Sequence, residues 1–271
     1  MSSIGRAGCK ARSVSLLPDY SRQAERYDET RSASPSVLRE LHKALKGAPG
    51  TRLADIGGGT GNYSLALKAR GWRPIVIDRS AAMLARAATK GLQTVEADAQ
   101  RLPFGDQTFD AAMMISMLHH VEDRGVALAE ARRILRPGGR LVLVGFTGED
   151  AADMWILDYF PVSRPWMEAT HPPRSVFVSE LPGSAVVSFQ FEDMEDASLA
   201  ALSADPERVL AAAQQGRTSF FERLRRDHPA ELEAGLARLR DDIAGDRAPR
   251  RAGTASVLSW TKPATRQPAR A

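Results

Sequence analysis

Residues 51–61 decide the fold and read TRLADIGGGTG. Thr51 to Ile56 is a short apolar run that predicts a buried strand, and the glycines between 57 and 61 allow the backbone to turn sharply and approach a ligand closely. A helix is predicted from Asn62 to Arg70, closed by Gly71. A strand, a glycine-rich turn and a helix in this order are typical of the first unit of a doubly wound α/β sheet, which binds ligands at the carboxyl ends of its strands.

The alternation of strands and helices continues beyond this unit. Phe109 to Ser116 is nearly all apolar, as expected for a central strand that is buried on both faces. Pro137-Gly138-Gly139 is interpreted as a turn that stops a helix before the next strand. Further strands are predicted at 73–77, 93–96, 140–146, 185–191 and 254–261, and further helices at 36–46, 80–89, 126–135 and in a block from 197 to 244. The pattern predicts a mostly parallel, Rossmann-like sheet of seven strands with helices on both faces.

Composition excludes several classes of protein. Hydrophobic residues make up 43% of the 271 residues and charged residues 26%, which is ordinary for a globular protein. No apolar run approaches the roughly 20 residues that span a bilayer, so we expect no membrane partner and a cytoplasmic location. Cys9 is the single cysteine, which excludes an internal disulfide and a cysteine-based metal site. The net charge is +4, but the excess of arginine lies towards the ends of the chain, and acids are interleaved elsewhere, so we expect no nucleic-acid partner.

The spacing of the glycines narrows the class of ligand. A dinucleotide fingerprint needs a third glycine where this chain has Asn62 or Ser64, and no Gly-Lys pair follows to make a phosphate-binding loop. The pattern is instead D-x-G-x-G-x-G, with Asp55 two residues before Gly57. A carboxylate at that position would repel a pyrophosphate, whereas it suits a ligand that carries an ammonium group and no phosphate. The spacing therefore argues against a nicotinamide oxidoreductase.

With these motifs the chain resembles the class I S-adenosylmethionine-dependent methyltransferases. The resemblance covers residues 20–146 and is greatest to the branch of ubiquinone and menaquinone C-methyltransferases and bacterial natural-product methyltransferases. Besides the glycine loop it rests on Asp78 at the end of the second strand, on Glu96-Ala97-Asp98-Ala99 after the third, and on the His-His-Val segment within 116–121. It implies the Rossmann-like fold, S-adenosylmethionine as the cofactor and S-adenosylhomocysteine as its product.

The resemblance also implies which residues contact the cofactor. Asp78 is expected to hold the two ribose hydroxyls, and Asp98 to contact the adenine. Asp78 could instead cap the following helix, Asp98 could be a turn residue, and Met83 could be helix core. The complete set of expected cofactor contacts is Tyr27, Asp55, Gly57, Gly58, Gly59, Gly61, Asn62, Asp78, Arg79, Met83, Asp98, Ala99, Ser116 and Met117.

Four segments are expected along the chain. The resemblance implies that the N-terminal helix with Tyr20 and Tyr27 folds over the cofactor as a lid, and Tyr27-Asp28-x-x-Arg31 fits the Y-D-x-x-R pattern of the branch. An ordinary amphipathic helix is the alternative. The expected segments are a helical lid at 1–46, a cofactor-binding core at 47–147, a substrate cap with a helical insertion and final strands at 148–262, and a flexible tail at 263–271.

The acceptor site and the catalytic groups are less constrained by the sequence. Trp155, Tyr159, Phe160 and Trp166 offer rigid apolar surfaces for a flat or lipophilic acceptor, although they could equally form the core of the cap. The candidate catalytic groups are His119, His120 and Tyr27. The two histidines could instead be structural. No metal site is expected, because the five histidines are scattered along the chain. Apolar residues of the 197–244 block could pack on the sheet or on a second subunit in a homodimer.

The predicted reaction is transfer of a methyl group from S-adenosylmethionine to an O, N or C atom of a small-molecule acceptor, such as a secondary metabolite or a quinone-like compound. In-line displacement makes alignment the main requirement, and a base is needed only where the acceptor atom must lose a proton. Two alternatives stay open: a methyltransferase that acts on tRNA or rRNA, and a protein of the same fold that binds S-adenosylmethionine without transferring its methyl group.

Overall fold

The computed structural model describes residue 28 and residues 31–193, 198–215 and 218–264. Within these residues, seven strands form one sheet in the order β3-β2-β1-β4-β5-β7-β6. The strands are β1 (Arg52–Ile56), β2 (Arg73–Asp78), β3 (Gln93–Glu96), β4 (Phe109–Ile115), β5 (Leu135–Gly145), β6 (Ala185–Gln190) and β7 (Thr254–Thr261). Strands β1 to β5 pair in parallel, and β7 runs antiparallel to both β5 and β6. The expected mostly parallel, doubly wound sheet is confirmed.

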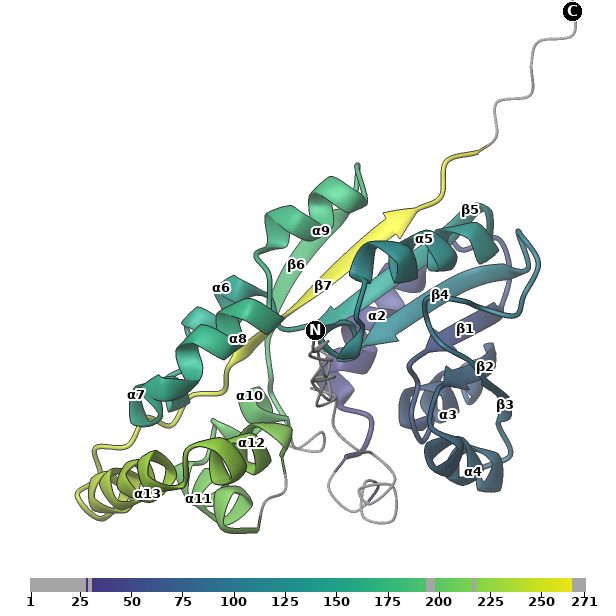
Figure 1. Ribbon diagram of the computed structural model, residues 1–271. Coiled ribbons are helices and arrows are strands. Elements are labelled where there is room, and N and C mark those ends of the chain that lie inside the picture. The colour runs from purple at the N-terminus through teal and green to yellow at the C-terminus, as the bar shows by residue number, and fades with distance from the viewer. Residues whose placement is uncertain (1–27, 29–30, 194–197, 216–217, 265–271) are drawn as a thin grey trace, which may run out of the picture.

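Helices cover both faces of the sheet (Figure 1). The first helices are α2 (Pro35–Leu45), α3 (Asn62–Lys68), α4 (Ala81–Thr89) and α5 (Arg124–Ile134). After β5 come α6 (Gly148–Ala152), α7 (Ile156–Tyr159), α8 (Arg164–Thr170) and α9 (Arg174–Glu180). Between β6 and β7 lie α10 (Leu199–Leu202), α11 (Pro206–Gln215), α12 (Ser219–Asp227) and α13 (Pro229–Ala244), and single 3-10 turns are η1 (Leu118–His120) and η2 (Pro161–Ser163).

The side chains of β4 point to two hydrophobic cores, one on each face of the sheet. In β4, Ala111 and Met113 face the core that contains Leu41 of α2. Phe109 and Met114 also belong to β4, but they face the other core, which contains residues of α5 and α9. Because β4 is buried on both faces, it carries no alternating polar residues, which is why its sequence is almost continuously apolar.

Side-chain caps fix where several helices begin, and so fix the strand-to-helix turns that surround the ligand edge of the sheet. The Ser80 hydroxyl accepts a hydrogen bond from Met83 N at the start of α4, and the Asp123 carboxylate accepts one from Val126 N at the start of α5. These caps satisfy backbone donors that the helix itself leaves unpaired. Both helices start immediately after segments that line the ligand edge.

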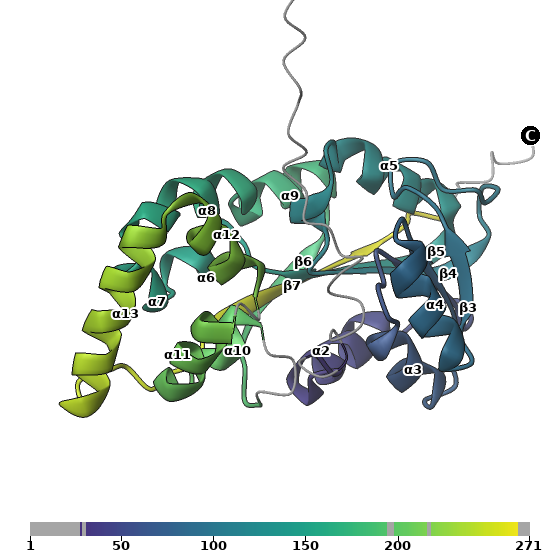
Figure 2. The same cartoon turned by 60° about the horizontal axis from the view of Figure 1, so that its bottom comes forward.

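Two expectations are corrected by the structure. The Pro137-Gly138-Gly139 segment does not separate α5 from a later strand, because β5 begins at Leu135 and continues through it. Gly138 has φ +77° and donates its N–H to Lys262 O, so the segment is an irregular part of the strand that is held by the chain leaving β7. The helical block after β6 also packs mainly on itself and on α7, beside the sheet and not across it (Figure 2).

Candidate active site

A cavity of about 950 Å³ lies at the carboxyl ends of β1, β2, β3 and β4. Nine of the side chains or backbone segments expected to contact the cofactor line it: Gly57, Gly59, Asp78, Arg79, Met83, Asp98, Ala99, Ser116 and Met117. The other lining residues are Ile56, Ile77, Ala97, Gln100, Ile115, His120, Val121 and Glu122. The parallel register explains the convergence, because strands that run in the same direction bring their carboxyl ends to one edge. We call this space the cofactor cavity.

The glycine loop has a backbone conformation that excludes side chains at its first position. Gly57 has φ +70°, and a Cβ atom there would lie 2.8 Å from the side chain of Met117. The N–H groups of Gly57 and Gly58 donate to the carbonyl oxygen of Ile77, at 2.7 and 3.1 Å, which ties the loop to the end of β2. The loop therefore lies close against the cavity with its backbone exposed to a ligand.

Asp78 connects the loop to the next helix. One oxygen of its carboxylate accepts the N–H of Gly59 at 2.9 Å, and the other accepts the N–H of Ser80 at 2.9 Å. The carboxylate is half-buried at the cavity wall, and each oxygen has a further lone pair. Ser80, and not Asp78, supplies the cap of α4. Asp78 is thus able to support the turn and to accept hydroxyl groups from a ligand at the same time.

Met83 and Asp98 lie on two other parts of the cavity wall. Met83 is buried in α4 and also lines the cavity, so it belongs to the helix core and to the ligand site. Asp98 is exposed after β3, and its carboxylate accepts the N–H of Gln100 at 2.8 Å, as a turn residue does. Asp98 is therefore a turn residue that also lines the cavity.

Asp55 does not line the cofactor cavity. Its side chain lies beneath the glycine loop with the residue only 2% exposed, and it accepts the hydroxyl of Ser64 at 2.7 Å. A Cβ atom at Gly58 would approach this carboxyl group to 2.5 Å, so the small residue at 58 makes room for the acid. Burial raises the pKa of Asp55 to about 7, and the nearby Asp78 carboxylate adds to the rise while the Ser64 hydrogen bond opposes it. Asp55 thus shapes the loop from below.

This buried acid predicts a pH-dependent stability. The pKa of Asp55 is about 7 in the folded protein against an ordinary 3.8, so the protonated carboxyl stabilises the fold. That contribution is complete below pH 4 and is lost as the pH rises towards 7, by up to about 1.4 kcal/mol per pH unit. In urea unfolding at pH 5 to 8, Asp55→Asn should gain in stability relative to the unsubstituted chain as the pH increases. If the free energies of unfolding of the two proteins changed in parallel between pH 5 and 8, Asp55 would be ionised in the folded protein over this whole range.

Two other residues expected to contact the cofactor have structural roles. Gly61 is buried with φ +74° and precedes α3, where a Cβ atom would lie 2.5 Å from Leu92. The amide of Asn62 donates to the carboxylate of Asp28 at 3.1 Å and accepts the ammonium group of Lys90 at 2.6 Å. Neither residue lines the cofactor cavity, because both face the side of the loop away from it.

Asp28 attaches the N-terminal segment to the glycine loop. Its carboxylate accepts the hydroxyl of Thr60 at 2.6 Å and forms an ion pair with Lys90 at 2.9 Å. Burial alone would raise the pKa of Asp28, but the hydrogen bonds from Thr60, Lys90 and Asn62 and the Lys90 charge lower it below its ordinary value. Tyr20, Tyr27 and most of the expected lid lie outside the described residues.

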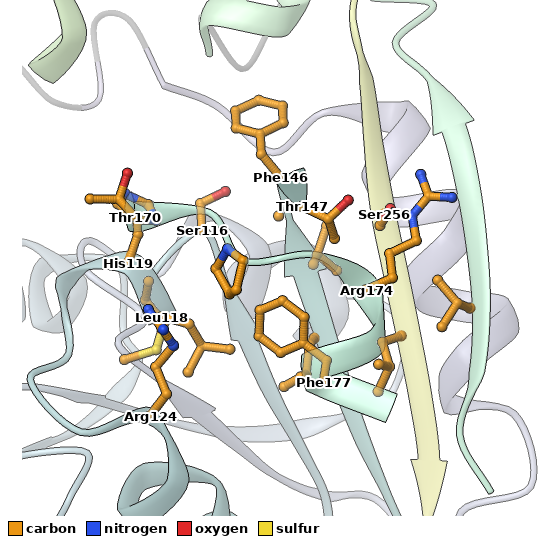
Figure 3. A pocket seen from close by; sticks show the side chains of 17 residues that line it. Ser116, Leu118, His119, Arg124, Phe146, Thr147, Thr170, Arg174, Phe177 and Ser256 are labelled. Carbon is orange, nitrogen blue, oxygen red and sulfur yellow. Dashed lines mark hydrogen bonds between the residues drawn. The ribbon is translucent and has the colours of Figure 1, made fainter. Parts of the chain in front are cut away.

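A second cavity, of about 560 Å³, adjoins the first at the carboxyl ends of β4 and β5. The two share Ser116 and Met117, and Ser116 has φ +49°, an uncommon conformation for a residue with a side chain. We call this space the acceptor cavity; Figure 3 shows Phe177 between Arg124 on one side and Arg174 on the other. It is lined by Ser116, Met117, Leu118, His119, Arg124, Leu143, Val144, Gly145, Phe146, Thr147, Thr170, Pro172, Arg174, Phe177, Val186, Ser256 and Leu258.

Three histidines lie close together, although His171 is far from His119 and His120 in the sequence. The ring centroids of His119 and His120 lie 3.8 Å apart, and His171 stacks on His119 at 5.3 Å. No group of His, Cys, Asp or Glu side chains within the described residues could hold a metal ion. Burial lowers the pKa of His119 well below its ordinary value and that of His120 to about 4, and neighbouring His171 lowers both further. These rings are therefore neutral at neutral pH.

The four aromatic residues expected to bind the acceptor lie in the cap instead. Phe160 is fully buried against Phe220 and Phe221, and the Trp155 indole N–H donates to the carbonyl oxygens of Ser203 and Arg251. The Tyr159 hydroxyl is 2.8 Å from the Asp242 carboxylate, and Trp166 packs on Phe220 with Arg223 over its ring. None of the four lines the cofactor cavity or the acceptor cavity. Their described contacts are those of a core.

Residues that sequence reasoning missed form most of the acceptor cavity. Arg124 begins α5, Arg174 begins α9, and Phe177 lies one turn further along α9. They come from segments that are far apart in the sequence and that carry no shared motif. The one local signal was the Ser116 to Val121 segment, which follows β4 and supplies His119.

Comparison with known proteins agrees with this geometry. A methyltransferase domain family matches residues 54–143, which run from β1 into β5 and include the glycine loop, Asp78 and Asp98. This part of the chain, about a third of its length, is thus similar to a methyltransferase domain. The chain is 38% identical over 109 residues to a demethylmenaquinone methyltransferase of Mycobacterium bovis. It is 38% identical over 148 residues to an enzyme of the same name from a Mycobacterium species.

These matches concern part of each relative. The chain spans about half the length of the Mycobacterium bovis protein, 47%, and 64% of the Mycobacterium species protein. A solved structure from Anabaena variabilis, titled as a methyltransferase from an antibiotic biosynthesis pathway, shares the fold beyond the methyltransferase domain, with a TM-score of 0.70 and 24% identity over 84% of this chain and 98% of that one. In the described part of the chain, no helix is both long and apolar enough to cross a membrane.

Proposed function

We propose that this chain transfers a methyl group from S-adenosylmethionine to an O, N or C atom of a small-molecule acceptor. The observation that carries the proposal is the pair of adjoining cavities, which meet at Ser116 and Met117. One cavity is polar at its rim and formed by the methyltransferase domain. The other is mostly apolar and formed by elements on both sides of β5. A donor and an acceptor held in these two spaces would meet at the shared wall.

The residues around the cofactor cavity suit S-adenosylmethionine. In this proposal the Asp78 carboxylate accepts two ribose hydroxyls, and Asp98 with Ala99 holds the adenine at the end of β3. All three residues line the cavity. The exposed backbone of the glycine loop suits the amino-acid part of the ligand. When bound, S-adenosylmethionine supplies a methyl group that is already electrophilic.

The chain then contributes alignment, exclusion of water and a proton acceptor. Phe146, Phe177 and Leu258 give the acceptor cavity an apolar wall that holds an acceptor in one orientation and displaces water. His119 lines the same cavity, and its lowered pKa keeps its ring neutral at neutral pH. A neutral ring has a nitrogen lone pair for the proton of an acceptor hydroxyl or amine, but the burial that lowers its pKa also makes it a weaker base than a free imidazole. A carbon acceptor that is already nucleophilic would not need it.

The methyl acceptor of the relatives is not proposed as the acceptor of this chain. The matched family residues end at 143, whereas the acceptor cavity also uses residues from 144 to 258. A secondary metabolite or a quinone-like compound with an apolar body suits the mostly apolar lining of this cavity. Aromatic and aliphatic side chains of this kind usually contact such a body without hydrogen bonds.

Isotope transfer tests the proposal. The purified chain, with S-adenosylmethionine carrying a radiolabelled methyl group, should label a compound in a bacterial metabolite extract, and His119→Gln should lower the rate while S-adenosylhomocysteine binds with unchanged affinity. Bulk tRNA and ribosomal RNA provide the comparison arm. Label in RNA alone would favour the RNA methyltransferase. Binding of S-adenosylhomocysteine without transfer to any extract would favour a protein that binds the cofactor for another purpose.

A further inference from the structure

The acceptor cavity has an uncompensated positive charge. Arg124 and Arg174 are the charged side chains among its lining residues, and no aspartate or glutamate within the described part of the chain lines it. Apart from them the wall is mostly apolar, with Leu143, Phe177 and Leu258 as examples. A charge at the edge of an apolar space is costly unless a counter-charge accompanies it. Which ligands the cavity accepts therefore depends on whether each arginine already has a counter-charge within the protein.

Arg174 already has its counter-charges inside the protein. One terminal nitrogen of its guanidinium donates to the buried Asp150 carboxylate at 3.1 Å, and its Nε donates to the Ser256 hydroxyl at 3.1 Å. The Glu149 carboxylate accepts the backbone N–H of Arg174 and lies 3.9 Å from its Nε. Asp150 stays ionised, because hydrogen bonds from Ser256 and Thr147 lower its pKa against the effect of burial. Arg174 is therefore a neutralised part of the wall.

Arg124 is different. It is half-buried, and within the described residues its guanidinium has no hydrogen bond and no ion pair. It is also the first residue of α5, an 11-residue helix, where the helix dipole disfavours a positive side chain. His171, which is close enough to Arg124 for that charge to lower its pKa, stays neutral and offers no counter-charge. The structure thus places an unpaired cation next to an apolar wall.

We infer that the acceptor is a lipophilic carboxylic acid whose carboxylate pairs with Arg124 while its apolar body lies against Phe177 and Leu258. The inference deepens the proposed function and rests on it, since it names the class of molecule that is methylated. A carboxylate matches one arginine in charge and in its two-pronged geometry. A phosphate monoester would bring a second negative charge for which Arg124 provides no partner. The reacting atom would lie towards Ser116 and Met117, where the two cavities meet.

Binding of small aromatic probes tests this without any need for turnover. 2-Naphthoate, 2-naphthalenemethanol and 2-naphthyl phosphate share one apolar body and differ in charge. Their dissociation constants are measured by calorimetry with the full chain saturated with S-adenosylhomocysteine. Naphthoate should bind at least about tenfold more tightly than the alcohol, because a hydrogen-bonded ion pair contributes about that much. Arg124→Gln should remove this difference by weakening naphthoate alone.

A control variant on the same helix shows whether the effect is specific to Arg124. Arg132→Gln removes an exposed arginine of the same helix that does not line the cavity, so it should leave all three affinities unchanged. Equal binding of naphthoate and the alcohol to the unsubstituted chain, or a preference that survives in Arg124→Gln, would overturn the inference. Tighter binding of the phosphate would overturn the carboxylate assignment. Failure of S-adenosylhomocysteine to bind would count against the proposed function and is measured separately.

Discussion

Asp78→Ala should weaken the binding of S-adenosylmethionine by at least about 100-fold, because two hydrogen bonds to a charged carboxylate contribute about 1.5 kcal/mol or more each. The carboxylate lies in the wall of the cofactor cavity at the end of β2, where it also accepts the backbone N–H groups of Gly59 and Ser80. Its removal therefore takes away ligand contacts and loosens the glycine loop together. Calorimetric titration with S-adenosylhomocysteine measures the change.

Glu96→Ala provides the matched control. Glu96 is the register partner of Asp78 on the neighbouring strand β3, and its exposed side chain does not line the cofactor cavity. The Glu96→Ala substitution should change the affinity for S-adenosylhomocysteine by less than about twofold, since a surface substitution away from a site has little effect. Circular dichroism of both variants shows whether the fold is intact. An unchanged affinity in a folded Asp78→Ala protein would remove Asp78 from the ribose site.

Phe160→Ala should lower the free energy of unfolding by about 3–5 kcal/mol, the usual cost of removing a buried phenyl ring. Phe160 has no exposed surface, and its ring lies 5.7 Å from that of Phe221 and 6.1 Å from that of Phe220, edge to face in both pairs. Gly235 of α13 packs so closely that a Cβ atom there would overlap the ring. The cavity left by alanine has no neighbour able to fill it.

Urea unfolding monitored by circular dichroism measures this loss. Val178→Ala, at an exposed position of α9, is the control and should change stability by less than about 0.5 kcal/mol. The hypothesis that Phe160 binds the acceptor makes the opposite prediction. A stable Phe160→Ala protein with weaker acceptor binding would return this ring to the acceptor site, together with its neighbours in the cap.

The cofactor half of the site could be predicted from sequence because its determinants are local. The expected contacts that line the cavity, apart from Met83 of α4, stand at or just after the end of a strand, and strands that run in parallel bring those positions to one edge of the sheet. β3 at 93–96 and β7 at 254–261 were predicted with their observed bounds, since turn-forming residues flank both. The same reasoning did not distinguish Asp78, which faces the cavity, from Asp55 and Asn62, which support the loop from its other side.

The acceptor half depends on contacts over long distances in the sequence. One cavity is lined by Arg124, Arg174 and Ser256, and Ser256 lies there because β7 is inserted between β5 and β6. No spacing within one segment of the sequence encodes that arrangement. The aromatic residues of the cap suggested a ligand site for the same reason that they form a good core, since both uses need large rigid apolar surfaces. The irregular Gly138 position in β5 likewise depends on the carbonyl of Lys262, which lies far along the chain.

The helical block between β6 and β7 has a consequence for how proteins of this fold could diversify. Gln190 and Thr254 are opposite one another in the sheet, so the block leaves and rejoins at adjacent points, and its exchange for another would leave the strand register intact. Phe220 of the block packs on Trp166 of α8, and Thr170 at the end of α8 lines the acceptor cavity. A different block would therefore move one short helix and remould the space for the acceptor, while the donor's half of the molecule keeps its shape. In this way the shape of the acceptor cavity can change while the cofactor cavity stays the same.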